Sequence, residues 1–279
     1  MKKLTLFFLI LLVQLPNAFA ESATVDLSPE NTFTSGIEGP ALSEEKILFA
    51  VNMKEEGTVG VISPHSEPQV LFKLPQGGVG NAIVLNKGLM FVADYKNHIL
   101  WKYDFKTREL KNHIQNTQWN QPNDMVLTKG GIFYLTDPNW SADTGTLWMV
   151  SQNKKVKLLE DKMGTTNGIA LSPGEKFLYV NESSQRKIWR YTLKNKIPKD
   201  KKLFYSFQDG ALDGMKCDTK GNLYVTRYGM GLVAVLSSEG KLIKEYSLKG
   251  KRPSNLVLNG KNIFVTVQDR GTVEVISLR

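Results

Sequence analysis

The sequence repeats one short apolar and aromatic pattern six times. The copies read ILFAVN (47–52), LMFVAD (89–94), IFYLTD (132–137), FLYVN (177–181), NLYVTR (222–227) and NIFVTV (262–267). Their first residues follow one another at intervals of 42, 43, 45, 45 and 40 residues. Branched and aromatic side chains in runs this short favour β-strands, so each copy predicts one strand of a repeating unit.

Further short segments accompany each copy. One precedes it and starts with a polar residue, as NGIAL does at Asn167 and DGMKC at Asp213. Another follows, such as GTLWMVS from Gly145, and five of the six units add one more, such as KKLFYSF from Lys201. Four strands in a repeat of about 40 to 50 residues are typical of a propeller blade. The sequence therefore predicts an all-β fold, a six-bladed β-propeller with four strands per blade.

The sixth unit has no fourth segment, because the sequence ends at Arg279 directly after the third. We expect the early segment ATVDL (23–27) to supply that strand, which would close the ring and leave no open edge between the first and last blades. An open solenoid is the alternative, but no atypical capping unit is visible in the sequence. With no linker and no shift of composition, residues 21–279 are predicted to form a single domain.

The first twenty residues have a different character. Two lysines precede an apolar run at 4–13, and Ala18 and Ala20 form the small-x-small pattern of a cleavage site. This pattern predicts a bacterial-type signal peptide, residues 1–20, and a periplasmic or secreted protein. The run is shorter than the roughly 20 residues of a membrane span, so we expect no stable membrane insertion after cleavage. An uncleaved anchor is the alternative.

Composition excludes several classes of protein. The formal net charge is +9, but the basic residues are spread along the chain, and small runs such as 194–202 lie between predicted strands. Lysines in such places are typical of solvated turns and edge strands, so we predict no nucleic-acid partner. The single cysteine, Cys217, excludes an internal disulfide and a cysteine-based metal site.

Polar residues recur where the first strand of each unit begins. First strands line the channel of a propeller, so these residues should meet at one mouth of it. The six positions are Glu38, Asn81, Asn123, Asn167, Asp213 and Ser254. Carboxylate and amide oxygens without His or Cys suit a hard cation such as Ca²⁺. The predicted ligands are Glu38, Asn123, Asn167 and Asp213. The alternative is a turn role, since Asn-Gly and Asp-Gly are common turn pairs.

A second polar set lies where the second strands end. Its members are Asn52, Asp94, Asp137, Glu182 and Arg227, with Asn139, Trp140 and Tyr228 on adjoining loops. Antiparallel pairing places this set beside the same mouth. The predicted substrate-binding residues are Asp137, Asn139, Trp140, Arg227 and Tyr228. Asp137 would orient the substrate, the two aromatic rings would form walls, and Arg227 would pair with a carboxylate. A plain ion pair at the rim is the alternative for Arg227.

Several motifs occur in a fixed order along the chain. They are Glu38-Gly39-Pro40, PND (122–124), NGIALSPG (167–174) and DGM (213–215) with GNLYV (221–225). In this set the sequence resembles the gluconolactonase, senescence-marker-protein and luciferin-regenerating-enzyme family. The resemblance implies a six-bladed propeller with one divalent metal in its channel and hydrolysis of lactones or related esters. It also implies that Glu38, Asn167 and Asp213 are metal ligands. Asn123 would be a further contact to metal or substrate, and Asp213 the candidate general base.

Together these features predict an exported, divalent-metal-dependent hydrolase with a small lactone or ester as substrate. Ca²⁺ is the predicted cofactor, with Zn²⁺, Mg²⁺ and Mn²⁺ as alternatives. The cation would stabilise the developing oxyanion, Asp213 would accept a proton from water, and Asn123 would orient the substrate. The alternative function is a non-catalytic exported propeller, a binding or scaffolding module with a structural metal.

Overall fold

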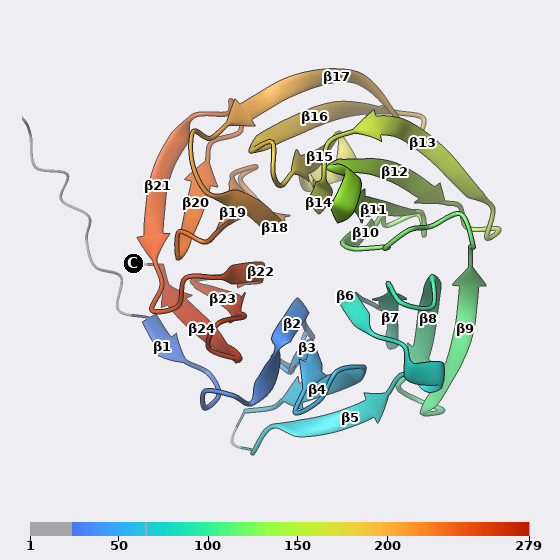
Figure 1. The fold of residues 1–279 in the computed structure, drawn as a ribbon, viewed down its shortest axis with the longest axis vertical. Helices are drawn as coiled ribbons and strands as arrows, with labels where there is room; N and C mark the ends of the chain where they lie inside the picture. Colours follow the sequence, from blue (N-terminus) through green and yellow to red (C-terminus); the bar gives the residue numbers. More distant parts are fainter. Residues whose placement is uncertain (1–23, 65, 279) are drawn as a thin grey trace, which may run out of the picture.

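Six four-stranded antiparallel sheets surround a central axis in the computed structural model (Figure 1). The structure describes residues 24–64 and 66–278, so the predicted signal peptide lies outside the described residues. Within each sheet the strands follow chain order from the hub to the rim, except that the sixth sheet ends with the earliest strand. The prediction of a six-bladed β-propeller is therefore confirmed.

The blades are numbered in chain order of their inner strands. The inner strands, which face the hub, are β2 (Phe33–Leu42), β6 (Gly80–Asn86), β10 (Met125–Leu127), β14 (Thr166–Leu171), β18 (Ala211–Cys217) and β22 (Pro253–Asn259). The second strands are β3 (Leu48–Met53), β7 (Leu89–Asp94), β11 (Phe133–Asn139), β15 (Phe177–Glu182), β19 (Leu223–Tyr228) and β23 (Asn262–Val267).

The third strands are β4 (Thr58–Ile62), β8 (Ile99–Asp104), β12 (Thr144–Val150), β16 (Lys187–Lys194), β20 (Leu232–Leu236) and β24 (Thr272–Ser277). The rim strands are β5 (Gln69–Lys73), β9 (Glu109–Gln115), β13 (Val156–Met163), β17 (Ile197–Ser206), β21 (Leu242–Ser247) and β1 (Thr24–Asp26). The part of the chain that the structure describes also contains three short 3₁₀ helices, η1 (Pro75–Gly77), η2 (Trp140–Ala142) and η3 (Pro173–Glu175). Within the described ranges, no helix has the length and apolar character needed to cross a membrane.

The N-terminal strand closes the ring, as the sequence predicts. β1 pairs antiparallel with β24, with Val25 opposite Val275. Arg270 reinforces this closure, because its guanidinium donates to both carboxylate oxygens of Asp26 at 2.7 and 2.8 Å. The hydrogen bond from Arg270 lowers the pKa of Asp26 to about 2, so the pair stays ionised across the neutral range.

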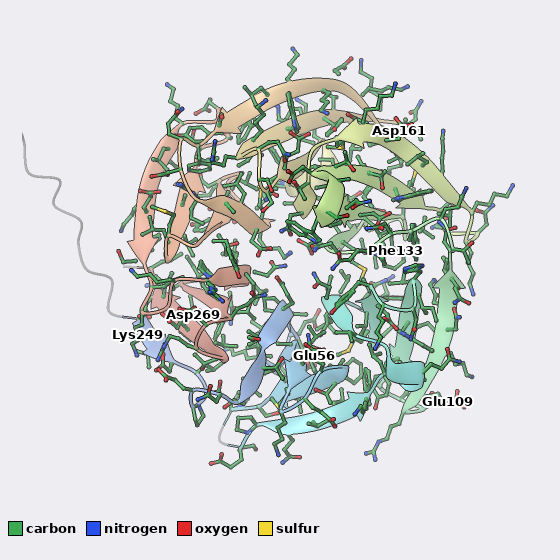
Figure 2. All side chains as sticks on the ribbon, in the orientation of Figure 1. Glu56, Glu109, Phe133, Asp161, Lys249 and Asp269 are labelled. Atoms are coloured by element: carbon green, nitrogen blue, oxygen red, sulfur yellow. The ribbon has the colours of Figure 1, made fainter. Side chains whose placement is uncertain are left out.

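The apolar core lies between the blades. Among the described residues, six buried clusters each join two neighbouring blades. Phe91 of blade 2, for example, meets Phe133 of blade 3 edge-on, with ring centroids 4.9 Å apart. Because both faces of each sheet are covered, the second strands are apolar over most of their length and do not alternate, as 48–51 of β3 shows. The rim strands instead carry charged side chains such as Glu109 and Asp161 (Figure 2).

Candidate metal and substrate site

A cavity of about 330 Å³ opens among the inner strands of the ring. Five of the six polar positions predicted at the channel mouth line it: Glu38, Asn81, Asn123, Asn167 and Asp213. Ser254, the sixth, does not. Its hydroxyl is fully buried and donates to the main-chain oxygen of Ile37 at 2.8 Å, so it ties blade 6 to blade 1.

Three of these residues are followed by a glycine inside a strand, and the first is Glu38, with Gly39 in β2. Asn167-Gly168 lies in β14 and Asp213-Gly214 in β18, and both pairs sit at irregularities of the strand register. The turn interpretation of these pairs is therefore wrong. A Cβ atom at Gly168 would collide with the main-chain oxygen of Asp213, and one at Gly214 with the side chain of Asn255. Glycine lets adjacent inner strands approach at the hub, and the bulges re-aim the neighbouring side chains.

Glu38 and Asp213 are buried carboxyl groups that act on each other electrostatically. Burial and, to a smaller extent, the nearby carboxylate of Asp124 raise the pKa of Glu38 to about 8. The main-chain N–H of Gly39, 3.0 Å from Glu38 Oε2, opposes that rise. Burial and the charge of Glu38 likewise hold the pKa of Asp213 well above its ordinary value, although a hydrogen bond with the Asn167 side chain lowers it. A cation between them would relieve the repulsion.

Asp124 is a third carboxylate at the hub, and the sequence reasoning assigned it no role. It is buried and accepts hydrogen bonds from the main-chain N–H groups of Met125 (2.9 Å) and Ile169 (3.3 Å). Lys216 Nζ lies 3.8 Å from its Oδ2 atom. Its place in the motif Pro122-Asn123-Asp124 was the one available signal.

The donor set fits a hard divalent cation. Glu38 and Asp213 supply two carboxylates, and Asn167 and Asn123 supply amide oxygens, all lining one cavity. Over residues 24–64 and 66–278, no three His, Cys, Asp or Glu side chains are grouped as a metal site. The amide oxygens are therefore essential to the candidate set. Oxygen donors of this kind, with room left for water and main-chain oxygens, are those that Ca²⁺ prefers.

The wall of the cavity contains two of the predicted aromatic residues. Trp140, in η2, lines it while remaining 43% exposed. Asn139 does not line it, because its side chain accepts from the N–H of Ala142 (3.3 Å) and from the Ser141 hydroxyl (2.8 Å). Asn139 thereby shapes the turn that carries Trp140. Across the ring, the Tyr228 hydroxyl donates to Gln268 Oε1 at 3.1 Å, which fixes the ring of Tyr228 at the edge of the cavity.

Asp137 is not brought into the cavity. Its carboxylate accepts from the main-chain N–H groups of Asn120 (3.0 Å) and Gln121 (2.5 Å), and from Trp148 Nε1–H (3.1 Å). These donors occupy the oxygens that the sequence reasoning assigned to a substrate. Asp137 instead holds the loop that enters blade 3.

Arg227 is engaged in the same way. Its guanidinium donates to Asp209 and, at 3.2 Å, to Glu245, and it lies 3.8 Å above the ring of Phe207. Glu182 also holds an incoming loop, by accepting from the N–H of Gly164 at 2.9 Å. The ion-pair alternative thus describes Arg227 better than a substrate contact does, and this second polar set holds the loops between blades.

Five further residues line the cavity that the sequence reasoning did not select: Gln121, Ser183, Ser184, Ala211 and Gln268. Ser183 and Gln268 directly follow the second strands of blades 4 and 6, much as Tyr228 ends that of blade 5. Applying one rule to all six units, namely the residues next to the end of the second strand, would have found them. Gln121 is placed by its main-chain hydrogen bond to Asp137.

The chain is similar in sequence and in fold to several known proteins. A gluconolactonase from Zymomonas mobilis is 29% identical over 192 residues, 60% of this chain and 54% of the relative, so the chain spans about half the length of that relative. Lactonase drp35 from Staphylococcus epidermidis is 32% identical over 230 residues, covering 77% of this chain and 70% of that protein. The fold matches regucalcin, a calcium-binding protein from Agrobacterium tumefaciens, with a TM-score of 0.80 and 20% identity over 92% of this chain and 94% of that one.

The family model described as the SMP-30/Gluconolactonase/LRE-like region matches residues 37–268, which include the inner-strand region of every blade. This range contains every residue of the candidate donor set. The chain therefore belongs to the SMP-30/gluconolactonase/LRE-like family.

Proposed function

We propose that the protein is a divalent-metal-dependent lactonase that acts after export. The observation that carries this proposal is the pair of buried carboxyl groups, Glu38 and Asp213, which share one open cavity with amide side chains. Two buried carboxylates are costly unless a cation offsets them, and the cavity leaves room for a small substrate beside them. Membership of a family with gluconolactonase and lactonase relatives supports ring-opening hydrolysis as the reaction.

Glu38, Asn167 and Asp213 would hold the cation, with Asn123 facing both cation and substrate. Lewis-acid activation of the lactone carbonyl is the chemistry that the cation supplies when bound. Because regucalcin is described as calcium-binding, Ca²⁺ is the first ion to test, and Zn²⁺, Mg²⁺ and Mn²⁺ are the alternatives.

The reacting groups on the protein would be Asp213 and Asn123. Asp213 takes a proton from the attacking water as that water adds to the carbonyl carbon. The ring C–O bond then breaks, and the proton passes from Asp213 to the departing ring oxygen. The amide N–H of Asn123 would donate to the substrate, and the Asn81 amide, 3.4 Å from the main-chain oxygen of Asn123, supports the segment that leads into β10.

The lining favours an uncharged, polar lactone. No Lys, Arg or His is among the described residues that line the cavity, whereas amides and hydroxyls are frequent. Apart from the proposed cation, a phosphate or carboxylate on the substrate would therefore find no cationic side chain there and would face Glu38 and Asp213. Hydroxyl groups could pair with Gln121, Ser184 and Gln268, and the Trp140 ring offers an apolar face for the substrate.

Hydrolysis of a lactone panel with and without chelator tests the proposal. We expect chelation to abolish turnover and Ca²⁺ to restore it, and Asp213→Ala to lower kcat/KM about a thousandfold. The matched control is Asp161→Ala, which removes an exposed carboxylate at the rim (Figure 2). A wild-type rate equal to that of Asp213→Ala on every substrate would favour the non-catalytic alternative.

Export is proposed from residues 1–20 alone. N-terminal sequencing of the protein recovered from a periplasmic extract tests it, with Glu21 expected as the first residue. Recovery of the intact N-terminus from the membrane fraction would favour the uncleaved anchor.

A further inference from the structure

An ion pair crosses the channel next to the candidate metal site, and the proposed hydrolysis does not use it. Lys216, on β18 of blade 5, reaches Asp124 of blade 3, with Nζ 3.8 Å from Oδ2. The Asp124 side chain is 3% exposed and that of Lys216 28%. Asp124 also accepts from the N–H of Ile169 in blade 4, so this Lys216–Asp124 bridge joins three blades.

The bridge acts directly on the candidate ligands. The charge of Asp124 acts on both Glu38 and Asp213, and the charge of Lys216 acts on Glu38. When all four groups are ionised, three carboxylates and one ammonium leave two negative charges. One divalent cation neutralises these two negative charges. Without Lys216, three negative charges would remain, which suits a more highly charged ion.

We propose that Lys216 is a charge-balancing and positioning residue that matches the hub to a single divalent cation. The inference rests on the proposed metal site and adds a determinant of its affinity and selectivity. The ammonium repels any bound cation, and it repels a trivalent ion more than a divalent one. It also offsets carboxylate repulsion while the site is empty, so Lys216 stabilises the metal-free ring at the expense of affinity.

Substitutions at Lys216 separate charge from shape. Lys216→Met removes the ammonium and keeps the length of the side chain, whereas Lys216→Arg keeps the charge. Lys220→Met is the matched control, because it removes the same charge from the exposed turn after β18. By calorimetric titration at low ionic strength we expect Lys216→Met to bind Ca²⁺ about tenfold more tightly, and Tb³⁺ to gain more than Ca²⁺. Lys216→Arg and Lys220→Met should stay near wild type.

A double-mutant cycle distinguishes charge balance from a purely structural role. Asp124→Asn alone should weaken Ca²⁺ binding about tenfold, because it leaves one negative charge. Lys216→Met combined with Asp124→Asn restores two negative charges, so its affinity should return to within about threefold of wild type. If the bridge only holds the blades together, the losses of Ca²⁺ affinity from the two single substitutions should add up in the double variant.

Melting temperatures in chelator give a readout that needs no metal. There Lys216→Met should melt several degrees below Lys220→Met, and Ca²⁺ should remove the difference. The proposal is wrong if Lys216→Met binds Ca²⁺ no more tightly than Lys220→Met, or if the double variant is weaker than both single variants. Failure of the wild-type protein to bind any of the four divalent ions would remove the proposed metal site instead. In that event equal melting temperatures of Lys216→Met and Lys220→Met in chelator would also overturn the role of the bridge.

Discussion

Asp213 belongs to the polar set at the starts of the inner strands, and Asp137 belongs to the set at the ends of the second strands. Both are buried aspartates. The carboxylate of Asp137 accepts hydrogen bonds from the main-chain N–H groups of Asn120 and Gln121 and from the side chains of Thr146 and Trp148. Asp213 faces the cavity beside Glu38, a second buried carboxyl group. The difference teaches that residue type and burial do not define a site in this fold. The distinguishing feature of Asp213 is that it lines the open cavity, whereas Asp137 does not.

The two aspartates should separate activity from stability most clearly. We expect Asp213→Asn to lower kcat/KM about a thousandfold while leaving the fold intact, because the amide neither takes the proton nor carries the charge for the cation. Asp137→Asn should retain kcat within about threefold. Steady-state kinetics on one lactone, with circular dichroism on the same samples, provides the comparison. Equal losses of activity in both variants would contradict the distinction between the two polar sets.

Stability should respond in the opposite order. Asp137→Ala leaves the part-buried main-chain N–H groups of Asn120 and Gln121 without their acceptor and removes a buried hydrogen bond of Trp148. We therefore expect the free energy of unfolding to fall by about 3 kcal/mol and Tm by roughly 6 to 12 °C. In chelator, Asp213→Asn should melt at or above the wild-type temperature, because it removes repulsion with Glu38. Thermal unfolding of both variants checks this, and a Tm loss in Asp213→Asn as large as that in Asp137→Ala would contradict it.

The pH dependence of the metal-free protein sharpens the contrast. Burial raises the pKa of Glu38 from an ordinary value of 4.5 to about 8, so between these values the folded state binds more protons than the unfolded state. Stability in chelator should therefore fall as pH rises from about 4.5 through about 8, by about 5 °C or more in Tm. Saturating Ca²⁺ should flatten the profile, and so should Glu38→Gln. A chelated profile that rises over this window would refute the assignment.

The smallest effect on activity and stability is expected from Trp140, at the mouth of the cavity. Trp140 is largely exposed, so Trp140→Ala should leave Tm within about 1 °C and raise KM about fivefold through loss of an apolar contact with substrate. Trp140→Phe should recover most of that loss. Trp148, which is buried and donates to Asp137, is the contrasting tryptophan, and Trp148→Ala should lower Tm instead. An unchanged KM in Trp140→Ala would remove this residue from the substrate wall.

The propeller fold could be predicted because the residue pattern that specifies each blade is local and recurs along the sequence. Each second strand is covered on both faces, so segments such as 89–93 and 177–180 are continuously apolar and recur at intervals of 40 to 45 residues. Register then places Glu38, Asn167 and Asp213 at one end of the inner strands without knowledge of any contact.

Sequence reasoning was weaker where long-range contacts decide the role of a side chain. The repeat gives the position of Asp137 but not the main-chain donors that occupy it, since these come from a loop about 17 residues earlier. The contact between Lys216 and Asp124 depends on the curvature of the ring, which brings blade 5 to blade 3 across the hub. Ser184 lies in a short turn, and its residue type carries no distinctive pattern.

Titration of chelator-treated protein with Ca²⁺, followed by calorimetry and by lactone hydrolysis in parallel, tests the central claim most directly. If Glu38, Asn167 and Asp213 gather one catalytic cation, calorimetry should give one ion per chain, activity should return in step with its binding, and Asp213→Asn should lose both. Full hydrolysis by the metal-free protein, or a variant lacking Asp213 that binds Ca²⁺ as the wild type does, would contradict the account.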